Sequence, residues 1–240
     1  MKYMGSKRRI AKYILPIINS YLSGVSTYFE PFVGGFNMME NVYLSNGRMI
    51  ASDYNKYLIC LYRSLKLGWL PPEVISEELY DDIKLNKDSY PDELVGYVGF
   101  SLSFGGKWFG GYRRDKKGDN SRENELVQSR RAFNEIMRQV STPAFQKTWF
   151  FWDDYSNTLI PNNSLVYCDP PYANTTKYTN PFDSNAFWGW VRATSAHSVV
   201  LVSEYSAPDD FDCVWSMPLA NTLNTEGSKQ SVEKLFKYKG

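Results

Sequence analysis

The chain has 240 residues, of which 43% are hydrophobic, 22% are charged and 16% are aromatic, and its formal net charge is +1. This composition is ordinary for a globular protein and excludes an intrinsically disordered chain. Because the net charge is so small, any polyanion must be met by a local basic patch and not by the overall field of the molecule.

The cysteines and the histidine predict no metal site. Cys60, Cys168 and Cys213 lie far apart, without C-x-x-C spacing or clustered histidines, and we interpret them as reduced, buried thiols. The single histidine, His197, has no nucleophile near it in sequence and is interpreted as structural.

No apolar run reaches the ~18–20 residues that cross a bilayer, and the basic N-terminus lacks the features of a signal peptide. We therefore expect a cytoplasmic protein without membrane contact, acting as a monomer or weak dimer.

The first 67 residues predict a helix and then a strand–helix–strand–helix unit. The helix follows Ser6, and Pro16 is expected to kink or shorten it. The predicted elements after it are a strand at 27–29, a glycine turn at 34–35, a helical stretch through 38–42, a strand at 48–52 and a helix through 58–65.

From about Gly68 this alternation stops, and prolines and glycines interrupt the chain as far as residue 147. Within this region, residues 121–140 predict a helix and the glycine-rich stretch before it a hairpin or ordered loop. The alternation then resumes with strands at 148–152 and 164–168, a helix capped by Asp183, and strands at 199–203, 211–217 and 232–238. We predict an α/β sheet with helices on both faces, built from residues 1–67 and 148–240, with residues 68–147 as an insertion.

The tetrapeptide Asp169-Pro170-Pro171-Tyr172 directly follows the apolar strand predicted at 164–168. Ligands bind at the carboxyl ends of strands in such a sheet. An aromatic amine such as adenine N6 is a poor nucleophile because its lone pair is delocalised into the ring, so it needs acceptors that favour a tetrahedral nitrogen. The Asp169 carboxylate and the Pro170 carbonyl can each accept one N–H, and Tyr172 would stack on the base. The alternative interpretation is a rigid turn with a solvated aspartate.

A second motif is the turn Glu30-Pro31-Phe32-Val33-Gly34-Gly35, whose small residues let a ligand approach the backbone between a strand and a helix. Asp53 lies 19 residues after Gly34, at the end of the next predicted strand. This matches the ~20-residue offset at which an acidic residue binds ribose hydroxyls, so nucleoside binding is favoured. The chain has no G-x-G-x-x-G motif, which disfavours NAD, and no P-loop motif.

A third motif is the segment 107–117, in which five of eleven residues are basic and three are aromatic. Basic side chains reach phosphates, and arginine and aromatic side chains contact bases. Composition alone supports a DNA-binding segment and a solvated charged loop equally.

Taken in order, these motifs resemble those of the Dam-type DNA adenine-N6 methyltransferases, particularly the phage-borne members. The resemblance spans nearly the whole chain, from residues 2–7 and 30–35 through Asp53, the insertion and the tetrapeptide to residues 232–236. It implies a Rossmann-like methyltransferase fold with a mixed sheet and an inserted, mostly helical target-recognition sub-domain. It also implies S-adenosylmethionine as cofactor and double-stranded DNA as partner. The family often has F-x-G-x-G in its turn, whereas here the third small position is Phe36.

The resemblance also assigns roles to residues. The family binds its cofactor through an aromatic residue and a lysine near the N-terminus, an acidic residue after the second strand, and the aspartate of the tetrapeptide. With the glycine turn, the expected cofactor-binding residues are Tyr3, Lys7, Glu30, Pro31, Phe32, Gly34, Gly35, Asp53 and Asp169. The expected catalytic residues are Asp169, Pro170, Pro171 and Tyr172. Since the family reads its target through the insertion, the expected DNA-binding residues are Lys107, Trp108, Tyr112, Arg113, Arg114, Lys116 and Lys117.

The expected reaction is methylation of adenine N6 on a base flipped out of the duplex. Methylation of cytosine N4 stays an alternative because that amine poses the same chemical problem. RNA and protein-amide methyltransferases usually begin the tetrapeptide with Asn, whereas this chain has Asp169. A further alternative is a DNA-binding paralogue without catalysis, but such a protein would be expected to lose Asp53 or the tetrapeptide, and both are present.

Overall fold

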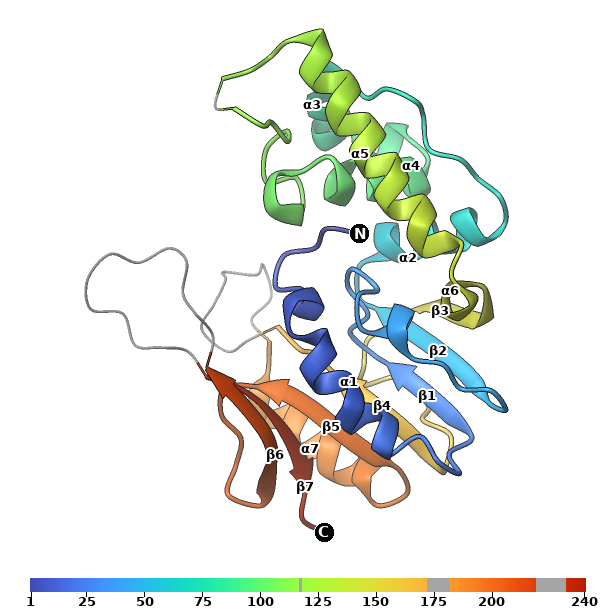
Figure 1. Ribbon diagram of the computed structural model, residues 1–240, viewed down its shortest axis with the longest axis vertical. Coiled ribbons are helices and arrows are strands. Elements are labelled where there is room, and N and C mark those ends of the chain that lie inside the picture. The colour runs from blue at the N-terminus through green and yellow to red at the C-terminus, as the bar shows by residue number, and fades with distance from the viewer. Residues whose placement is uncertain (117, 172–181, 219–231) are drawn as a thin grey trace, which may run out of the picture.

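The computed structural model describes residues 1–116, 118–171, 182–218 and 232–240 (Figure 1). In these residues the strands form a seven-stranded sheet in the order β3-β2-β1-β4-β5-β7-β6. Strands β1 to β5 run parallel, and β7 is antiparallel to both β5 and β6. The strands are β1 (Thr27–Glu30), β2 (Arg48–Asp53), β3 (Thr148–Trp152), β4 (Ser164–Cys168), β5 (Val199–Glu204), β6 (Phe211–Pro218) and β7 (Val232–Tyr238). The mixed α/β sheet predicted from the sequence is confirmed.

Helices cover both faces of the sheet because the buried strands are apolar on both sides. On β1, for example, Tyr28 and Phe29 point to opposite faces and belong to two separate hydrophobic clusters. The cluster around Tyr28 includes residues of α1 (Ala11–Ser20), α2 (Lys56–Lys66) and α6 (Pro143–Lys147). The cluster around Phe29 includes residues of α7 (Ser184–Ser195).

Side-chain caps set where these helices begin. The Asn55 side chain accepts the Leu58 N–H at 3.1 Å at the start of α2, and Asp183 accepts the Ala186 N–H at 3.0 Å at the start of α7. Ser6 caps a short 3-10 turn, η1 (Lys7–Arg9), which leads into α1. The predicted first helix is thus confirmed, and Pro16 lies inside it.

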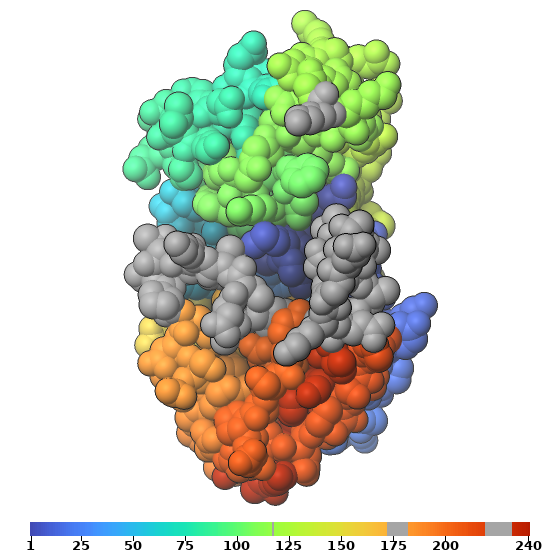
Figure 2. All heavy atoms as spheres, turned by 90° about the vertical axis from the view of Figure 1, so that its left-hand side faces the viewer, coloured from blue at the N-terminus to red at the C-terminus, as the bar shows by residue number. Residues whose placement is uncertain are grey.

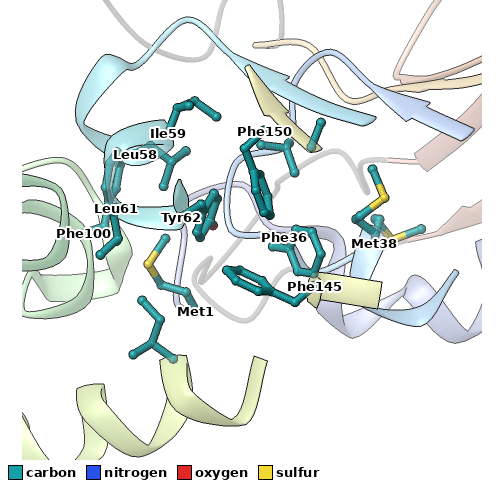
Figure 3. Close-up of a cluster of buried hydrophobic side chains, with 14 of the residues drawn as sticks. Met1, Phe36, Met38, Leu58, Ile59, Leu61, Tyr62, Phe100, Phe145 and Phe150 are labelled. Atoms are coloured by element: carbon teal, nitrogen blue, oxygen red, sulfur yellow. The ribbon is translucent and has the colours of Figure 1, made fainter. Parts of the chain in front are cut away.

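The helical stretch predicted through residues 38–42 is wrong, because only a 3-10 turn, η2 (Met39–Asn41), forms there. The reason is Phe36, whose backbone is left-handed at φ 61° and whose ring is fully buried. The ring packs against the rings of Tyr62, Phe145 and Phe150 (Figure 3). The left-handed backbone costs about 1–2 kcal/mol, whereas burying the ring contributes about 2–3 kcal/mol, so packing wins over helix formation.

The insertion is mostly helical, as predicted, and the helix expected at 121–140 is confirmed. Its elements are α3 (Glu77–Leu85), η3 (Lys87–Ser89), α4 (Asp92–Ser101), η4 (Phe104–Gly106) and α5 (Arg122–Val140). Figure 1 shows α3, α4 and α5 together beyond one end of the sheet. The insertion does not have a separate core, since α4 and α2 contribute to one hydrophobic cluster. They approach closely because α4 has Gly96, where a Cβ would lie 2.2 Å from the Tyr57 carbonyl oxygen.

The outer edge of β3 is closed by cations from α2. The Arg63 Nε donates to the Phe150 carbonyl at 2.8 Å, and the Lys66 Nζ donates to the Thr148 carbonyl at 2.7 Å. These bonds satisfy carbonyl groups that would otherwise be free to pair with another strand.

The three cysteines are free, and they differ in exposure. Cys168 is buried in β4 and Cys60 is half-buried, but Cys213 is exposed on the outer strand β6. The expectation of buried thiols is therefore wrong for Cys213, because an outer strand is covered on fewer sides. Within the described residues, no helix combines the length and apolarity needed to cross a membrane.

Candidate functional site

The parallel sheet brings the predicted site residues to one edge, where the strands end. Glu30 ends β1, Asp53 ends β2, and Asp169 directly follows β4. A fourth acid, Asp153, directly follows β3, and its N–H donates to the Asp53 carbonyl at 3.3 Å. Our sequence analysis missed Asp153, although an acidic residue directly after a predicted strand is the same signal that identified Asp53.

Asp53 organises the glycine turn. Its Oδ2 accepts the Gly34 N–H at 3.0 Å and its Oδ1 accepts the Asn55 N–H at 3.0 Å. The Tyr62 hydroxyl fixes the other side of the turn by donating to the Gly34 carbonyl at 2.7 Å. Each Asp53 oxygen keeps a further lone pair for a ligand hydroxyl. Burial raises the pKa of Asp53 to about 6, and the two backbone N–H bonds oppose this rise.

The N-terminal segment runs across the glycine turn. A Cβ on Gly34 would lie 2.9 Å from the Tyr3 ring, and a Cβ on Gly35 would lie 2.6 Å from the Tyr3 Cβ. The Tyr3 ring stacks on Phe100 of α4, with ring centroids 5.2 Å apart, and the Met4 N–H donates to the Gly106 carbonyl at 3.2 Å. Figure 2 shows the N-terminal residues at the surface between the insertion and the sheet. The double glycine therefore makes room for the chain's own Tyr3, a role that the sequence did not indicate.

Lys7 connects Asp169 of the tetrapeptide to strand β7. Its Nζ lies 2.7 Å from Asp169 Oδ1 and 3.4 Å from Glu233 Oε1 of β7. Lys7 is 5% exposed, yet burial is outweighed by the two carboxylates, which raise the pKa of Lys7. Burial raises the pKa of Asp169, and Lys7 opposes this rise. Our sequence analysis included residues 232–236 in the family resemblance but assigned Glu233 no role, because only folding brings it within reach of Lys7.

Other residues of the predicted turn face the core. The Glu30 side chain is buried and accepts the Tyr28 hydroxyl at 2.7 Å. Burial raises the pKa of Glu30 to about 8, and the hydrogen bond from Tyr28 opposes this rise. Pro31 is buried, and the half-buried Phe32 packs against the ring of Tyr155 with centroids 5.3 Å apart.

The tetrapeptide is described in part. Pro170 is buried and Pro171 is half-buried, directly after Asp169. Tyr172 lies outside the described residues, as does Lys117 of the basic segment. Among the described residues, no group of three or more His, Cys, Asp or Glu side chains has an arrangement that could hold a metal ion.

The aromatic residues of the basic segment lie inside the insertion. Tyr112 is 5% exposed, and its hydroxyl donates to the Ile75 carbonyl at 2.7 Å. Trp108 packs against Phe100 and Tyr57, with ring centroids 4.6 and 5.5 Å away. In this conformation the Tyr112 ring is buried and the Trp108 ring is half-buried.

The cations of the same segment differ from one another. Lys107 and Lys116 are exposed, and neither forms an ion pair with a described residue. Arg114 pairs with Glu77 of α3, and Asp115 accepts two bonds from Arg131 of α5 at 2.6 and 2.7 Å. Arg113 is half-buried, burial lowers its pKa, and its Nη1 has no hydrogen-bond partner among the described residues.

Comparisons with known proteins place this site in a family context. Residues 3–126 match the family model described as D12 class N6 adenine-specific DNA methyltransferase. The Type II methyltransferase M.FokI of Planomicrobium okeanokoites is 24% identical over 214 residues, which cover 80% of this chain and 31% of M.FokI. The modification methylase StsI of Streptococcus sanguinis is 26% identical over 204 residues, which cover 73% of this chain and 29% of StsI. A DNA adenine methylase of Vibrio cholerae is 25% identical over 201 residues, which cover 78% of this chain and 70% of that protein.

The chain thus spans about a third of the length of the first two relatives and more than two thirds of the third. The family match covers Tyr3, the glycine turn, Asp53 and most of the insertion, and it ends before Asp169.

Proposed function

Because the chain belongs to the family of D12 class N6 adenine-specific DNA methyltransferases, we propose that it transfers a methyl group from S-adenosylmethionine to adenine N6 in double-stranded DNA. The observation that carries this proposal is the position of Asp169, which Lys7 holds at 2.7 Å on the sheet edge that also carries Asp53. The Asp169 carboxylate is thereby available for the target base, and the Asp53 carboxylate for the nucleoside of the cofactor.

The chemistry of the edge residues fits the cofactor. Asp53 keeps one acceptor site on each carboxylate oxygen, which matches the two hydroxyls of a ribose. We propose that Asp53 and the turn at Gly34 bind the ribose, with Tyr3, Lys7 and Phe32 around it. When bound, S-adenosylmethionine supplies a methyl group activated by its sulfonium sulfur. Glu30 and Pro31 are buried beneath the turn, so we assign them the role of supporting it.

Asp169 and Pro170 act on the target amine. The Asp169 carboxylate accepts one N–H of the amine and the Pro170 carbonyl accepts the other, which directs the nitrogen lone pair toward the methyl group. Neither proline can donate a backbone N–H, and both fix φ, so the acceptors stay in place. We assign Tyr172 to stacking on the base. The base must leave the duplex to reach this edge, and the reaction is therefore one of base flipping.

We further propose that the insertion, residues 68–147, binds the DNA target. Lys107 and Lys116 offer exposed ammonium groups for phosphates, and Arg113 lies beside them with its Nη1 buried. Trp108 packs against Phe100, and Tyr112 donates to the Ile75 carbonyl, so both hold this segment in place. Arg114 forms an ion pair with Glu77 of the same insertion. The N-terminal segment joins the two halves of the site, because it contacts both the glycine turn and Gly106 of the insertion.

The proposal is tested by product analysis. The chain is incubated with duplex DNA and S-adenosylmethionine, the DNA is digested, and its nucleosides are separated by chromatography and mass spectrometry. We expect N6-methyldeoxyadenosine among the products. If N4-methyldeoxycytidine is found instead, the target base is cytosine and not adenine. The absence of any methylated nucleoside would refute methyl transfer. Asp169→Asn should lower kcat on the order of 10²–10³-fold. Asp88→Asn, at an exposed site on η3, is the matched control and should keep full activity.

A further inference from the structure

Two successive carbonyl groups of the glycine turn accept hydrogen bonds from buried side chains. The Gly34 carbonyl accepts from the Tyr62 hydroxyl of α2 at 2.7 Å. The Gly35 carbonyl accepts from the Gln139 Nε2 of α5 at 3.0 Å. The Gly35 carbonyl also lies 3.5 Å from the Met1 amino nitrogen, which is at the limit of hydrogen-bond length. Gln139 is therefore its closer donor, and the Gln139 side chain is fully buried.

A turn made of two glycines needs such donors, because glycine has no side chain that restricts its backbone. Both glycines are buried, and a buried carbonyl without a donor is costly, so the two bonds fix the direction of each peptide group. That direction matters to the site, since the Gly34 N–H donates to Asp53 at 3.0 Å. The buried donors thus give the turn the stiffness that its glycines lack.

Gln139 also holds residues that lie against the turn. Its Oε1 accepts from the Met1 amino group, and its Nε2 lies 3.4 Å from the Asn37 Oδ1. Asn37 in turn donates to the Met1 carbonyl at 3.1 Å and to the Ser6 hydroxyl at 2.8 Å. Asn37 is 4% exposed, so this network is shielded from water. A single amide of α5 therefore contacts both the turn and the N-terminal segment that crosses it.

Gln139 belongs to the insertion. It lies in the last turn of α5, which runs through the insertion toward the sheet (Figure 1). Arg131 of the same helix pairs with Asp115 of the basic segment at 2.6 Å. Because an α-helix rises about 1.5 Å per residue, Arg131 and Gln139 lie about 12 Å apart along the helix axis. One helix thus contacts both the segment expected to bind DNA and the turn expected to bind the cofactor.

We propose that Gln139 is a positioning residue through which helix α5 of the insertion fixes the glycine turn for cofactor binding. The inference rests on the proposed function and extends the cofactor site to a residue of the insertion. Because Gln139 is fully buried, it acts through the Gly35 carbonyl and not by contact with the cofactor. The insertion therefore contributes to cofactor affinity, in addition to the DNA binding proposed for it.

Isothermal titration calorimetry of the full chain with S-adenosylhomocysteine measures this effect. Gln139→Met removes both polar atoms of the amide and keeps the length of the side chain. Without its closer donor, the Gly35 carbonyl no longer holds the turn in one conformation, so binding should weaken roughly threefold to tenfold. An affinity within about twofold of wild type overturns the proposal.

Gln128→Met is the matched control. Gln128 lies on the same helix and is also fully buried, but its Nε2 donates to Asn124 of that helix at 3.1 Å and not to the turn. Each variant removes one buried amide, so both are expected to lose stability in urea denaturation. Gln128→Met should nevertheless bind S-adenosylhomocysteine as tightly as wild type. Equal weakening in the two variants would attribute the effect to lost stability and overturns the proposal.

Steady-state kinetics with saturating duplex DNA separate positioning from loss of folded protein. Gln139→Met should raise the KM for S-adenosylmethionine roughly threefold to tenfold and leave kcat within about twofold, since Asp169 and Pro170 are unchanged. A smaller fraction of folded chain would instead lower kcat and leave KM unchanged, and that result overturns the proposal.

Gln139→Asn serves if Gln139→Met does not fold. Asparagine keeps a buried amide but is shorter by one carbon–carbon bond, about 1.5 Å, which withdraws its nitrogen from the Gly35 carbonyl. It should weaken binding of S-adenosylhomocysteine relative to its own control, Gln128→Asn, and equal affinities in these two variants overturn the proposal. Failure of the wild-type chain to bind S-adenosylhomocysteine would instead refute the proposed function.

Discussion

Lys7 and Lys107 both belong to basic segments of the sequence, but the structure places them in opposite environments. Lys7 is buried at the sheet edge between two carboxylates, whereas Lys107 is exposed on the insertion and has no ion-pair partner among the described residues. The first charge is costly to bury and therefore has a fixed partner, while the second is solvated and free to attract a polyanion.

The sheet edge and the insertion therefore use charged side chains in different ways. At the sheet edge, Lys7 lies within ion-pair distance of Asp169 and Glu233, and Lys7 and Asp169 shift each other's pKa. On the insertion, two of the charges near Lys107 are already paired locally, Arg114 with Glu77 and Asp115 with Arg131. In the described part of this segment, Lys107 and Lys116 are the exposed cations without an ion-pair partner.

The largest effect that would sharpen this comparison is expected from Lys7→Met. Removing the ammonium takes away the cation that lies 2.7 Å from Asp169 and 3.4 Å from Glu233, so the free energy of unfolding should fall by about 3–5 kcal/mol. The deficit should shrink at low pH, where the two carboxylates become protonated. Urea denaturation at several pH values measures both. Lys116→Met on the exposed surface should change stability by less than about 0.5 kcal/mol, and equal losses in both variants would contradict the comparison.

The next effect concerns the stability cost of Glu30. Its pKa is raised by burial to about 8 in the folded chain, so its contribution to stability is fully present below its ordinary pKa and is lost as the pH rises through 8. Glu30→Gln removes this dependence. Relative to wild type, the variant should gain at most about 1.4 kcal/mol for each pH unit between pH 5 and 8. Thermal denaturation at pH 5, 6.5 and 8 follows this trend, and a constant difference across these values would show that the buried carboxyl is already ionised.

A smaller effect is expected at Asp53. Burial raises its pKa to about 6, and only the ionised form has both oxygens free to accept ribose hydroxyls. The affinity for S-adenosylhomocysteine should therefore fall about tenfold from pH 7 to pH 5. Calorimetry on wild type and Asp53→Asn tests this, because the variant should bind weakly with little pH dependence. The same pH dependence in both proteins would exclude Asp53 as its cause.

The smallest effects are expected on the insertion. Lys107→Ala and Lys116→Ala should each weaken binding to duplex DNA by roughly threefold to tenfold and reduce the slope of log affinity against log salt by about 1. Arg114→Ala should change the slope less, because Glu77 already neutralises Arg114. Fluorescence anisotropy at several salt concentrations gives these slopes. Arg48→Ala, at the amino end of β2, is the control, and a slope change there equal to that of Lys107→Ala would move the DNA surface away from the insertion.

Much of the fold was predictable because its signals are local. The apolar runs that became the strands, the cap at Asp183 and the helix at 121–140 each depend on residues close together in sequence. The stretch through 38–42 shows the limit of this reasoning. Its residues have helical spacing, but the ring of Phe36 packs against Tyr62, Phe145 and Phe150, and the left-handed backbone that this requires ends any helix at the turn.

The candidate site divides in the same way. Asp53 and Asp169 were identified because each follows a strand, and parallel strands end at the same edge. Glu233 and Asp153 were missed, and so was the passage of Tyr3 over the glycine turn. For Trp108 and Tyr112, contact with DNA was expected from the family resemblance and stays a prediction; Trp108 packs against Phe100 and Tyr57, and Tyr112 donates to the Ile75 carbonyl.

By itself, the sequence determined the strands in chain order, several of the helices, the family and two of the acids at the strand ends, because periodicity and short motifs are properties of neighbouring residues. Only the tertiary structure decided which charges meet. Lys7 reaches Glu233 across more than two hundred residues of chain because β7 is inserted beside β5, and burial then makes the pairing of those charges obligatory.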